Sequence, residues 1–207
     1  MKIAILTSLN QWFVPYAKNL SAELNADLLY SHEELTHAYE ICFILSYHKI
    51  IPKKFLQNNQ KNIIIHASDL PQGKGWSPLF WQVLEGKNDI VFSVFEANEG
   101  IDDGAVYFKK ILLLEGDELY EQLREKQALF TLVLCKEFLQ LQNPVATAQS
   151  TNMPISIYPK RSPQDHKLDV NKSIKEQFDL LRVSNNEEFP AYFEINGKHY
   201  KLEVSRK

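Results

Sequence analysis

Short runs of consecutive apolar residues, separated by helical patterns, constrain the fold of this chain most strongly. The runs of the first half cover residues 2–6, 40–46 and 62–66, and helical patterns fill residues 12–24 and 52–58 between them. Strands that are apolar on both faces and alternate with helices indicate a parallel sheet covered on both sides. The sequence therefore predicts an α/β protein with an open, mostly parallel twisted sheet flanked by helices.

The chain divides into three segments by composition. Residues 1–142 hold the apolar runs, two further strands near 89–97 and 105–113, and a long amphipathic helix. Residues 143–171 are rich in proline and small polar residues, which predicts a linker. Residues 172–207 predict a small subdomain made of a helix and a β-hairpin, because Asn196-Gly197 separates two alternating strands.

Charge and composition exclude several classes of protein. The net charge of −3 lacks the basic footprint of a nucleic-acid binder, and no apolar run approaches the ~20 residues of a membrane span. Cys42 and Cys135 lie in apolar runs, as core residues do. His32 and His37 are spaced wrongly for two ligands on one helical face, and no Cys/His cluster occurs, so we predict no metal. We expect a cytoplasmic protein without nucleic-acid or membrane partners.

Two ionisable residues stand at positions that suit catalysis. His66 ends the apolar run NIIIH, and a strand-end histidine taken alone is more often structural. In an open α/β sheet, however, sites form at the carboxyl ends of the strands, and the following loop contains Gly73 and Gly75, which allow a ligand to approach the backbone. Asp102 lies in the later loop GIDDG. A solvated acid is its ordinary interpretation, yet a carboxylate that meets a histidine is the usual partner in acid–base chemistry.

These residues carry a resemblance to a known family. The stretches IHASDLPQGKGWSP and GIDDG resemble the formyltransferases that use formyl-tetrahydrofolate, whose pattern is Asn-x-His-x-Ser-Leu-Leu-Pro, a basic residue and glycine, then Asp-x-Gly. The matching residues are His66, Ser68, Leu70, Pro71, Lys74, Gly75, Asp102 and Gly104. Ile64 replaces the family asparagine, and Asp69 stands where the family has a leucine.

The resemblance implies the formyltransferase fold, a formyl donor and two catalytic residues. The donor would be 10-formyltetrahydrofolate, and His66 and Asp102 would be catalytic: His66 would stabilise the tetrahedral oxyanion and shuttle a proton, while Asp102 would orient His66 or accept the proton of the attacking amine. The segment LSYHKIIPKKFL is similar to the one that flanks the folate pocket. The implied folate-binding residues are Ser46, Tyr47, Ile50, Ile51, Pro52 and Leu70.

Two further features narrow the range of possible acceptor amines. The stretch TSLNQWF after the first strand has no glycine, which argues against a phosphate-binding loop, and the short tail and acidic balance argue against a tRNA substrate. The chain looks most like the sugar-nucleotide N-formyltransferases of the pseudaminic-acid route, which formylate a 4-amino group. The implied substrate-binding residues are Lys74, Gly75, Trp76, Ser77, Tyr158, Arg161 and Arg182.

Two alternative functions remain open. The chain could be a non-catalytic folate- or nucleotide-binding protein, which the isoleucine at position 64 favours, or a formyltransferase for another amine. The edge of the C-terminal hairpin could also pair across a homodimer.

The isoleucine at position 64 raises a question about the oxyanion. Side chains alternate along a strand, so Asn62, Ile64 and His66 should share one face. Asn62 should lie too far down the strand to replace the missing amide unless a bulge intervenes. We therefore expect His66 and a backbone N–H of the 67–75 loop to stabilise the oxyanion.

Overall fold

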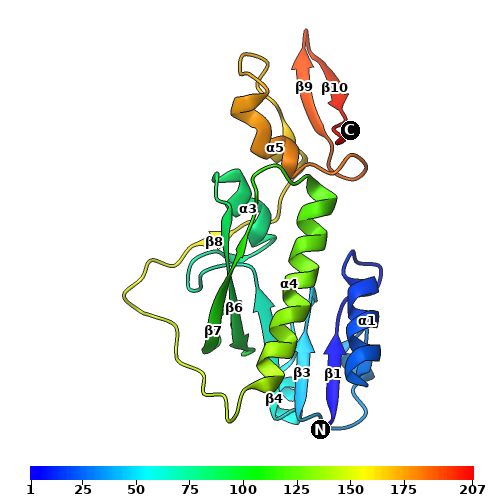
Figure 1. Cartoon of the computed structure of the whole chain (residues 1–207), viewed down its shortest axis with the longest axis vertical. Coiled ribbons are helices and arrows are strands. Elements are labelled where there is room, and N and C mark those ends of the chain that lie inside the picture. Colours follow the sequence, from blue (N-terminus) through cyan, green and yellow to red (C-terminus); the bar gives the residue numbers. More distant parts are fainter.

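A six-stranded sheet forms the centre of the computed structural model, which describes residues 1–207 (Figure 1). Its strand order is β2-β1-β3-β4-β6-β7. The first four strands in this row run parallel, β6 runs antiparallel to β4, and β7 runs antiparallel to β6. The mostly parallel α/β sheet that the sequence predicts is thereby confirmed. The strands are β1 (Ile3–Leu6), β2 (Asp27–Leu29), β3 (Ile41–Ile44), β4 (Lys61–His66), β6 (Asp89–Glu96) and β7 (Val106–Leu113).

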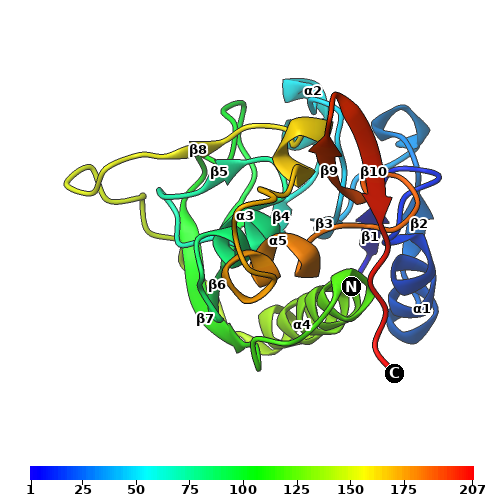
Figure 2. The same ribbon diagram turned by 90° about the horizontal axis from the view of Figure 1, so that it is seen from above.

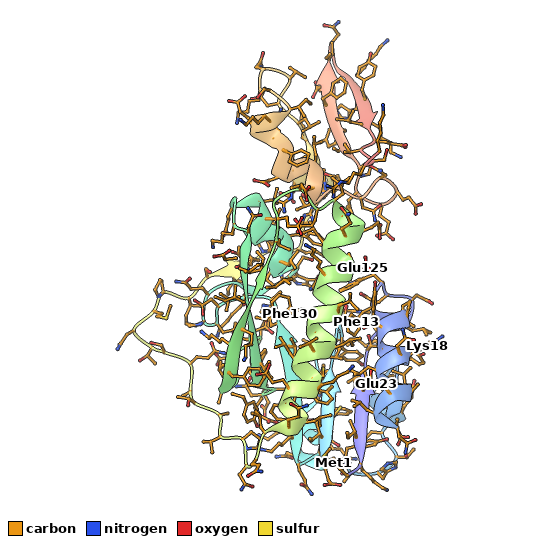
Figure 3. All side chains as sticks on the ribbon, viewed as in Figure 1. Met1, Phe13, Lys18, Glu23, Glu125 and Phe130 are labelled. Carbon is orange, nitrogen blue, oxygen red and sulfur yellow. The ribbon has the colours of Figure 1, made fainter.

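Helices cover both faces of the sheet (Figure 2). One face packs against α1 (Val14–Leu24), α3 (Pro78–Leu84) and α4 (Tyr120–Gln140), and the other packs against the short α2 (Lys53–Asn58). Phe130 of α4 is labelled in Figure 3. Its ring packs edge-on against Phe92 of β6, with the ring centroids 5.0 Å apart. None of the helices combines the length and hydropathy that crossing a bilayer requires.

Alternating burial explains why the strands read as unbroken apolar runs. In β1, Ile3 and Ile5 belong to the core beneath α1 and α4, whereas Ala4 and Leu6 belong to the core beneath α2. Because both faces of these strands are buried, neither set of alternate positions can be polar. The same environment holds Cys42, a free cysteine whose pKa burial raises to about 12.

A small C-terminal unit stands at the carboxyl edge of the parallel strands (Figure 1). It contains the short 3₁₀ turns Pro163–His166 and Lys175–Gln177, α5 (Phe178–Arg182), and the predicted hairpin of β9 (Ala191–Ile195) and β10 (Lys198–Leu202). Asn196 and Gly197 turn the hairpin with φ of 51° and 72°, which is why an Asn-Gly pair stands there. Leu168, Leu181 and Ala191 form its separate small core.

The segment that we predicted as a linker, residues 143–171, makes defined contacts with the sheet unit. Within it, β8 (Ile157–Tyr158) pairs in parallel with β5 (Lys74–Gly75) of the loop that follows His66. The segment leaves the end of α4, runs along the outside of β6 and β7 and then reaches α5 (Figure 1). A 3₁₀ turn, His32–Glu34, and the start of α3 complete the fold. Helix α3 begins at Pro78, and Ser77, whose backbone is left-handed with φ of 48°, does not cap it through its side chain.

Candidate active site

His66 lies at the carboxyl end of β4, on the side of the sheet that faces α2. Its side chain is 10% exposed, and its Nε2 atom lies 2.9 Å from the carbonyl oxygen of Gly73. A carbonyl oxygen can only accept a hydrogen bond, so Nε2 carries the hydrogen and His66 is held as an Nε2–H donor. The glycine loop after the strand thereby sets the tautomer of the ring.

Asp102 approaches His66 from the loop between β6 and β7. Its Oδ2 atom accepts a hydrogen bond of 2.8 Å from the N–H of Gly75 and lies 3.6 Å from Nε2 of His66. The side chain is 15% exposed, so solvent or a ligand can reach the carboxylate. The structure thus brings together the two residues that the sequence singled out as catalytic, although they belong to different loops.

The path of the Asp102 loop is unexpected. Because β6 runs antiparallel to β4, the loop starts beside Asn62, where the N–H of Ala97 donates to the Asn62 carbonyl oxygen. Residues 97–104 must then fold back along the α2 side to reach His66. Asp102 adopts a left-handed backbone, with φ of 48°. Gly104 closes the return so tightly that a Cβ atom there would lie 1.6 Å from the carbonyl oxygen of Glu96.

Gln149 is a residue at this site that the sequence did not indicate. Its Nε2 atom donates to the backbone carbonyl oxygens of Asp102 and Gly104, at 2.8 and 2.9 Å. It lies in the predicted linker, and a glutamine in a polar, proline-rich stretch carries no signal of such a role. The only available hint is the GIDDG loop itself, whose tight return leaves backbone carbonyls that need donors.

Lys74 and its neighbours hold the His66 loop. The N–H of Gly73 donates to Oγ of Ser156 at 2.8 Å, and the ring of Tyr158 packs so closely on Gly73 that a Cβ atom would lie 2.8 Å from it. Lys74 is buried and its ammonium forms an ion pair with Asp103. Lys74 thereby joins the His66 loop to the Asp102 loop, and its role as a substrate contact stays a prediction.

The strand register around Ile64 agrees with the expected alternation. Ile64 packs with the core beneath α2, whereas Ile63 belongs to the opposite core. β4 pairs with β3 without a bulge, so Asn62 stays two positions further down. The Asn62 amide is buried, donates to the Leu56 carbonyl oxygen at 2.8 Å and accepts from Asn59 at 2.9 Å. The side-chain amide of Asn62 uses its hydrogen bonds to hold α2 and the residue after it, so it does not replace the missing family amide.

Few backbone donors remain free in the 67–75 loop. All of its N–H groups donate to protein acceptors except those of Ala67 and Asp69. Any backbone contribution to an oxyanion must therefore come from these two groups. Ser68 adds a third polar group at this place, because its buried Oγ has no protein partner.

The segment predicted to bind folate follows β3 at the same edge of the sheet. Ile44 pairs with Ile64, so Ser46 follows at the level of His66. Ser46 has a left-handed backbone, with φ of 51°, and the Tyr47 hydroxyl contacts Nδ1 of His32 at 2.8 Å. The remaining predicted residues differ in exposure: Ile50 is 86% exposed, Pro52 is exposed, Ile51 is half-buried and Leu70 is buried.

The residues predicted to bind the acceptor fall into two groups. Trp76 is exposed, and the ammonium of Lys160 lies 5.4 Å from its ring centroid; Ser77 and Gly75 follow and precede it on the same loop. Tyr158 instead stacks on Trp81 and donates to Glu85, so its ring supports the loop.

The two arginines also differ. Arg182 is 1% exposed and its guanidinium binds Glu118 at 3.0 Å and Asp179 at 2.8 Å. These contacts link the C-terminal unit to the start of α4, and the substrate role of Arg182 stays a prediction.

Arg161 keeps hydrogen-bonding capacity. It donates to the Val183 carbonyl oxygen at 2.9 Å and contacts His166, but its buried Nε has no acceptor. Burial lowers its pKa to about 10, and the positive charge of Arg124 acts in the same direction. The guanidiniums of Arg161 and Arg124 both lie against the ring of Phe80, at 5.2 Å and 4.3 Å from its centroid, respectively. Two neighbouring cations without a carboxylate partner favour a bound anion.

Comparison with known proteins identifies the family. Residues 13–142 match the family described as formyl transferase, which covers more than half of the chain. The chain belongs to the formyl transferase family, and the family predicted from the His66 and Asp102 motifs is confirmed.

The curated relatives that the chain matches carry the name methionyl-tRNA formyltransferase. Methionyl-tRNA formyltransferase of Thermodesulfovibrio yellowstonii is 26% identical over 145 residues, which are 69% of this chain and 47% of that protein. The chain thus spans about half the length of the curated relatives that it matches.

Solved structures share the fold. Methionyl-tRNA formyltransferase from Clostridium thermocellum has a TM-score of 0.79 at 21% identity, covering 100% of this chain and 94% of that one. A sugar N-formyltransferase from Shewanella sp. has a TM-score of 0.71 at 19% identity, covering 100% and 98%. HypX from Aquifex aeolicus, in complex with tetrahydrofolic acid, has a TM-score of 0.69 at 17% identity, covering 99% and 37%.

Proposed function

We propose that this protein transfers a formyl group from 10-formyltetrahydrofolate to the 4-amino group of a nucleotide-linked dideoxy amino sugar, UDP-4-amino-4,6-dideoxy-N-acetyl-altrosamine. The observation that carries the reaction class is the His66–Asp102 pair, with Nε2 and Oδ2 separated by 3.6 Å. Acyl transfer between two nitrogens needs a hydrogen-bond donor for the developing negative oxygen and a base for the attacking amine. The pair offers both, and membership of the formyl transferase family supports the same reaction.

The loop after β3 suits the folate donor. An exposed Ile50 beside half-buried Ile51 offers apolar surface to a flat heterocycle, and the left-handed Ser46 turns the backbone at the level of His66. We therefore assign residues 46, 47, 50–52 and Leu70 to the donor. When bound, the folate supplies the formyl carbon as the electrophile.

His66 and Asp102 then have separate roles in the reaction. The Nε2–H of His66, now given to the Gly73 carbonyl oxygen, is the donor that can turn to the formyl oxygen as negative charge develops there. Asp102 accepts the proton from the attacking amine through the carboxylate oxygen that Gly75 does not hold. A base in this position typically contributes ~10²–10⁴ in rate.

The acceptor side favours an anionic small molecule. Trp76 with Lys160 gives a nucleobase a ring to stack on, and Arg161 beside Arg124 gives a diphosphate two cations. Sugar N-formyltransferases with the same fold support this choice. We place the reaction in the cytoplasm, and the hairpin edge of β10 leaves room for a homodimer.

Methionyl-tRNA is the second candidate acceptor, because the curated relatives and one structural neighbour act on it. The net charge of −3 argues against it, since binding RNA phosphates needs a basic surface.

A panel of acceptors decides between these functions. The purified protein and 10-formyltetrahydrofolate are mixed with UDP- and dTDP-linked 4-amino sugars or with methionyl-tRNA, and tetrahydrofolate release is followed. We expect release with a sugar nucleotide only. Release with methionyl-tRNA alone would replace the proposed acceptor, and binding of folate without release on any amine would indicate a non-catalytic binding protein.

A further inference from the structure

The loop that carries Asp102 folds back towards His66, and the pairing of β6 with β7 does not account for this path. Residues 97–104 leave β6 beside Asn62 and fold back along the sheet to reach His66. The backbone of Asp102 is left-handed there, a conformation that is uncommon for residues other than glycine. A loop with this course needs external contacts to hold it, because its own strand pairing ends at Glu96 and Val106.

Gln149 supplies such contacts. Both hydrogens of its amide go to backbone carbonyl oxygens of this loop, one on Asp102 and one on Gly104, at 2.8 and 2.9 Å. Rotating the amide would set its oxygen against two carbonyl oxygens, so its orientation is fixed. The backbone of Gln149 is itself anchored two residues earlier, where Thr147 and Val106 exchange two hydrogen bonds of 2.8 Å.

The same segment also holds the His66 loop. Seven residues further on, Ser156 accepts hydrogen bonds from Gly73 through its side chain and from Lys74 through its carbonyl oxygen, at 2.8 and 3.0 Å. β8 then pairs with β5. Residues 147–158 therefore contact both loops, and Gly73 and Gly75 in turn contact His66 and Asp102 directly.

We propose that Gln149 is a positioning residue that fixes the Asp102 carboxylate against His66, an inference that rests on the function proposed above. Gln149 acts on the backbone of Asp102 and need not touch either substrate. A displacement of about 1 Å in a catalytic group can cost up to about 10² in rate. Removing the two amide hydrogen bonds should therefore lower kcat about 10- to 100-fold while leaving the KM for the folate within about twofold.

Gln149→Met tests this, because methionine keeps the length of the side chain and removes both donors. Gln142→Met is the matched control, since Gln142 is an exposed glutamine directly before the segment 143–171 that carries Gln149. Both changes are made in the wild type and in Asp102→Ala, with the melting temperature as a check on folding. We expect Gln149→Met to lower kcat in the wild type and to cause no further loss in Asp102→Ala. Gln142→Met should leave kcat unchanged in both backgrounds.

A second measurement does not depend on turnover. The NMR signal of the His66 ring should shift in Gln149→Met in the same direction as in Asp102→Ala, and should stay in place in Gln142→Met. An unchanged kcat and an unchanged His66 signal would overturn the proposal, and so would a full additional loss in Asp102→Ala. A wild type that turns over no amine would refute the proposed function alone, and the His66 signal would then decide the role of Gln149.

Discussion

His166 should make this protein lose stability as the pH falls below neutrality. The ring is buried, stacks on Phe189 with centroids 5.7 Å apart, and contacts the Ser184 hydroxyl and the Arg161 guanidinium at 3.0 and 2.9 Å. Burial and the positive charge of Arg161 lower its pKa from 6.5 to about 4. The folded state therefore binds fewer protons than the unfolded state between these values, so its stability is complete above pH 6.5 and is lost as the pH falls towards 4.

The size of the effect follows from the two pKa values. Integrating the difference in proton binding from pH 7.5 to pH 5 gives a loss of about 2 kcal/mol in the free energy of unfolding. Urea unfolding followed by tryptophan fluorescence at several pH values measures it. His166→Gln keeps an acceptor for Arg161 but does not titrate, so its stability should fall about 2 kcal/mol less over this range. Equal slopes for the wild type and the variant would refute the reasoning.

Three further changes separate structural from functional residues. Asn62→Ala should leave kcat within about twofold but lower the free energy of unfolding by about 1–3 kcal/mol, since two buried partners lose hydrogen bonds; a loss in kcat as large as that of His66→Ala would mean that Asn62 serves the oxyanion. Arg161→Ala should weaken UDP binding by roughly 1.5–3 kcal/mol and leave folate binding unchanged, as calorimetry would show; equal weakening of both would count against an acceptor site. Arg182→Ala should lower the free energy of unfolding by about 1.5–3 kcal/mol, because buried Glu118 loses the charge-assisted hydrogen bond from Arg182 and keeps only the ion pair with Lys126 and its backbone donors; a stable variant that no longer binds UDP would support its predicted substrate role.

The sequence predicted those parts of the fold that local patterns encode. Apolar runs with both faces buried indicated the parallel strands, and Asn196-Gly197 indicated the hairpin, because each pattern directly reflects the environment of its own residues. His66 was identifiable because it interrupts an apolar strand at its carboxyl end.

Long-range partners could not be predicted in the same way. The role of Arg182 depends on Glu118, 64 residues away, and that of Lys74 depends on a carboxylate in another loop. Without knowledge of these partners, Arg182 and Lys74 are both expected to be cations on the surface. Gln149 was missed for the same reason. The residues around it do not indicate that its side chain binds backbone carbonyl oxygens of a distant loop.

The turnover of two variants tests the central claim most directly. His66→Asn keeps a polar side chain but removes the ring donor, and Asp102→Ala removes the carboxylate that lies 3.6 Å from it. With 10-formyltetrahydrofolate and the accepted sugar nucleotide both saturating, we predict that each folded variant loses at least about a hundredfold in kcat. Near-normal turnover in either variant, with circular dichroism and melting temperature unchanged, would contradict the assignment of this pair as the catalytic centre.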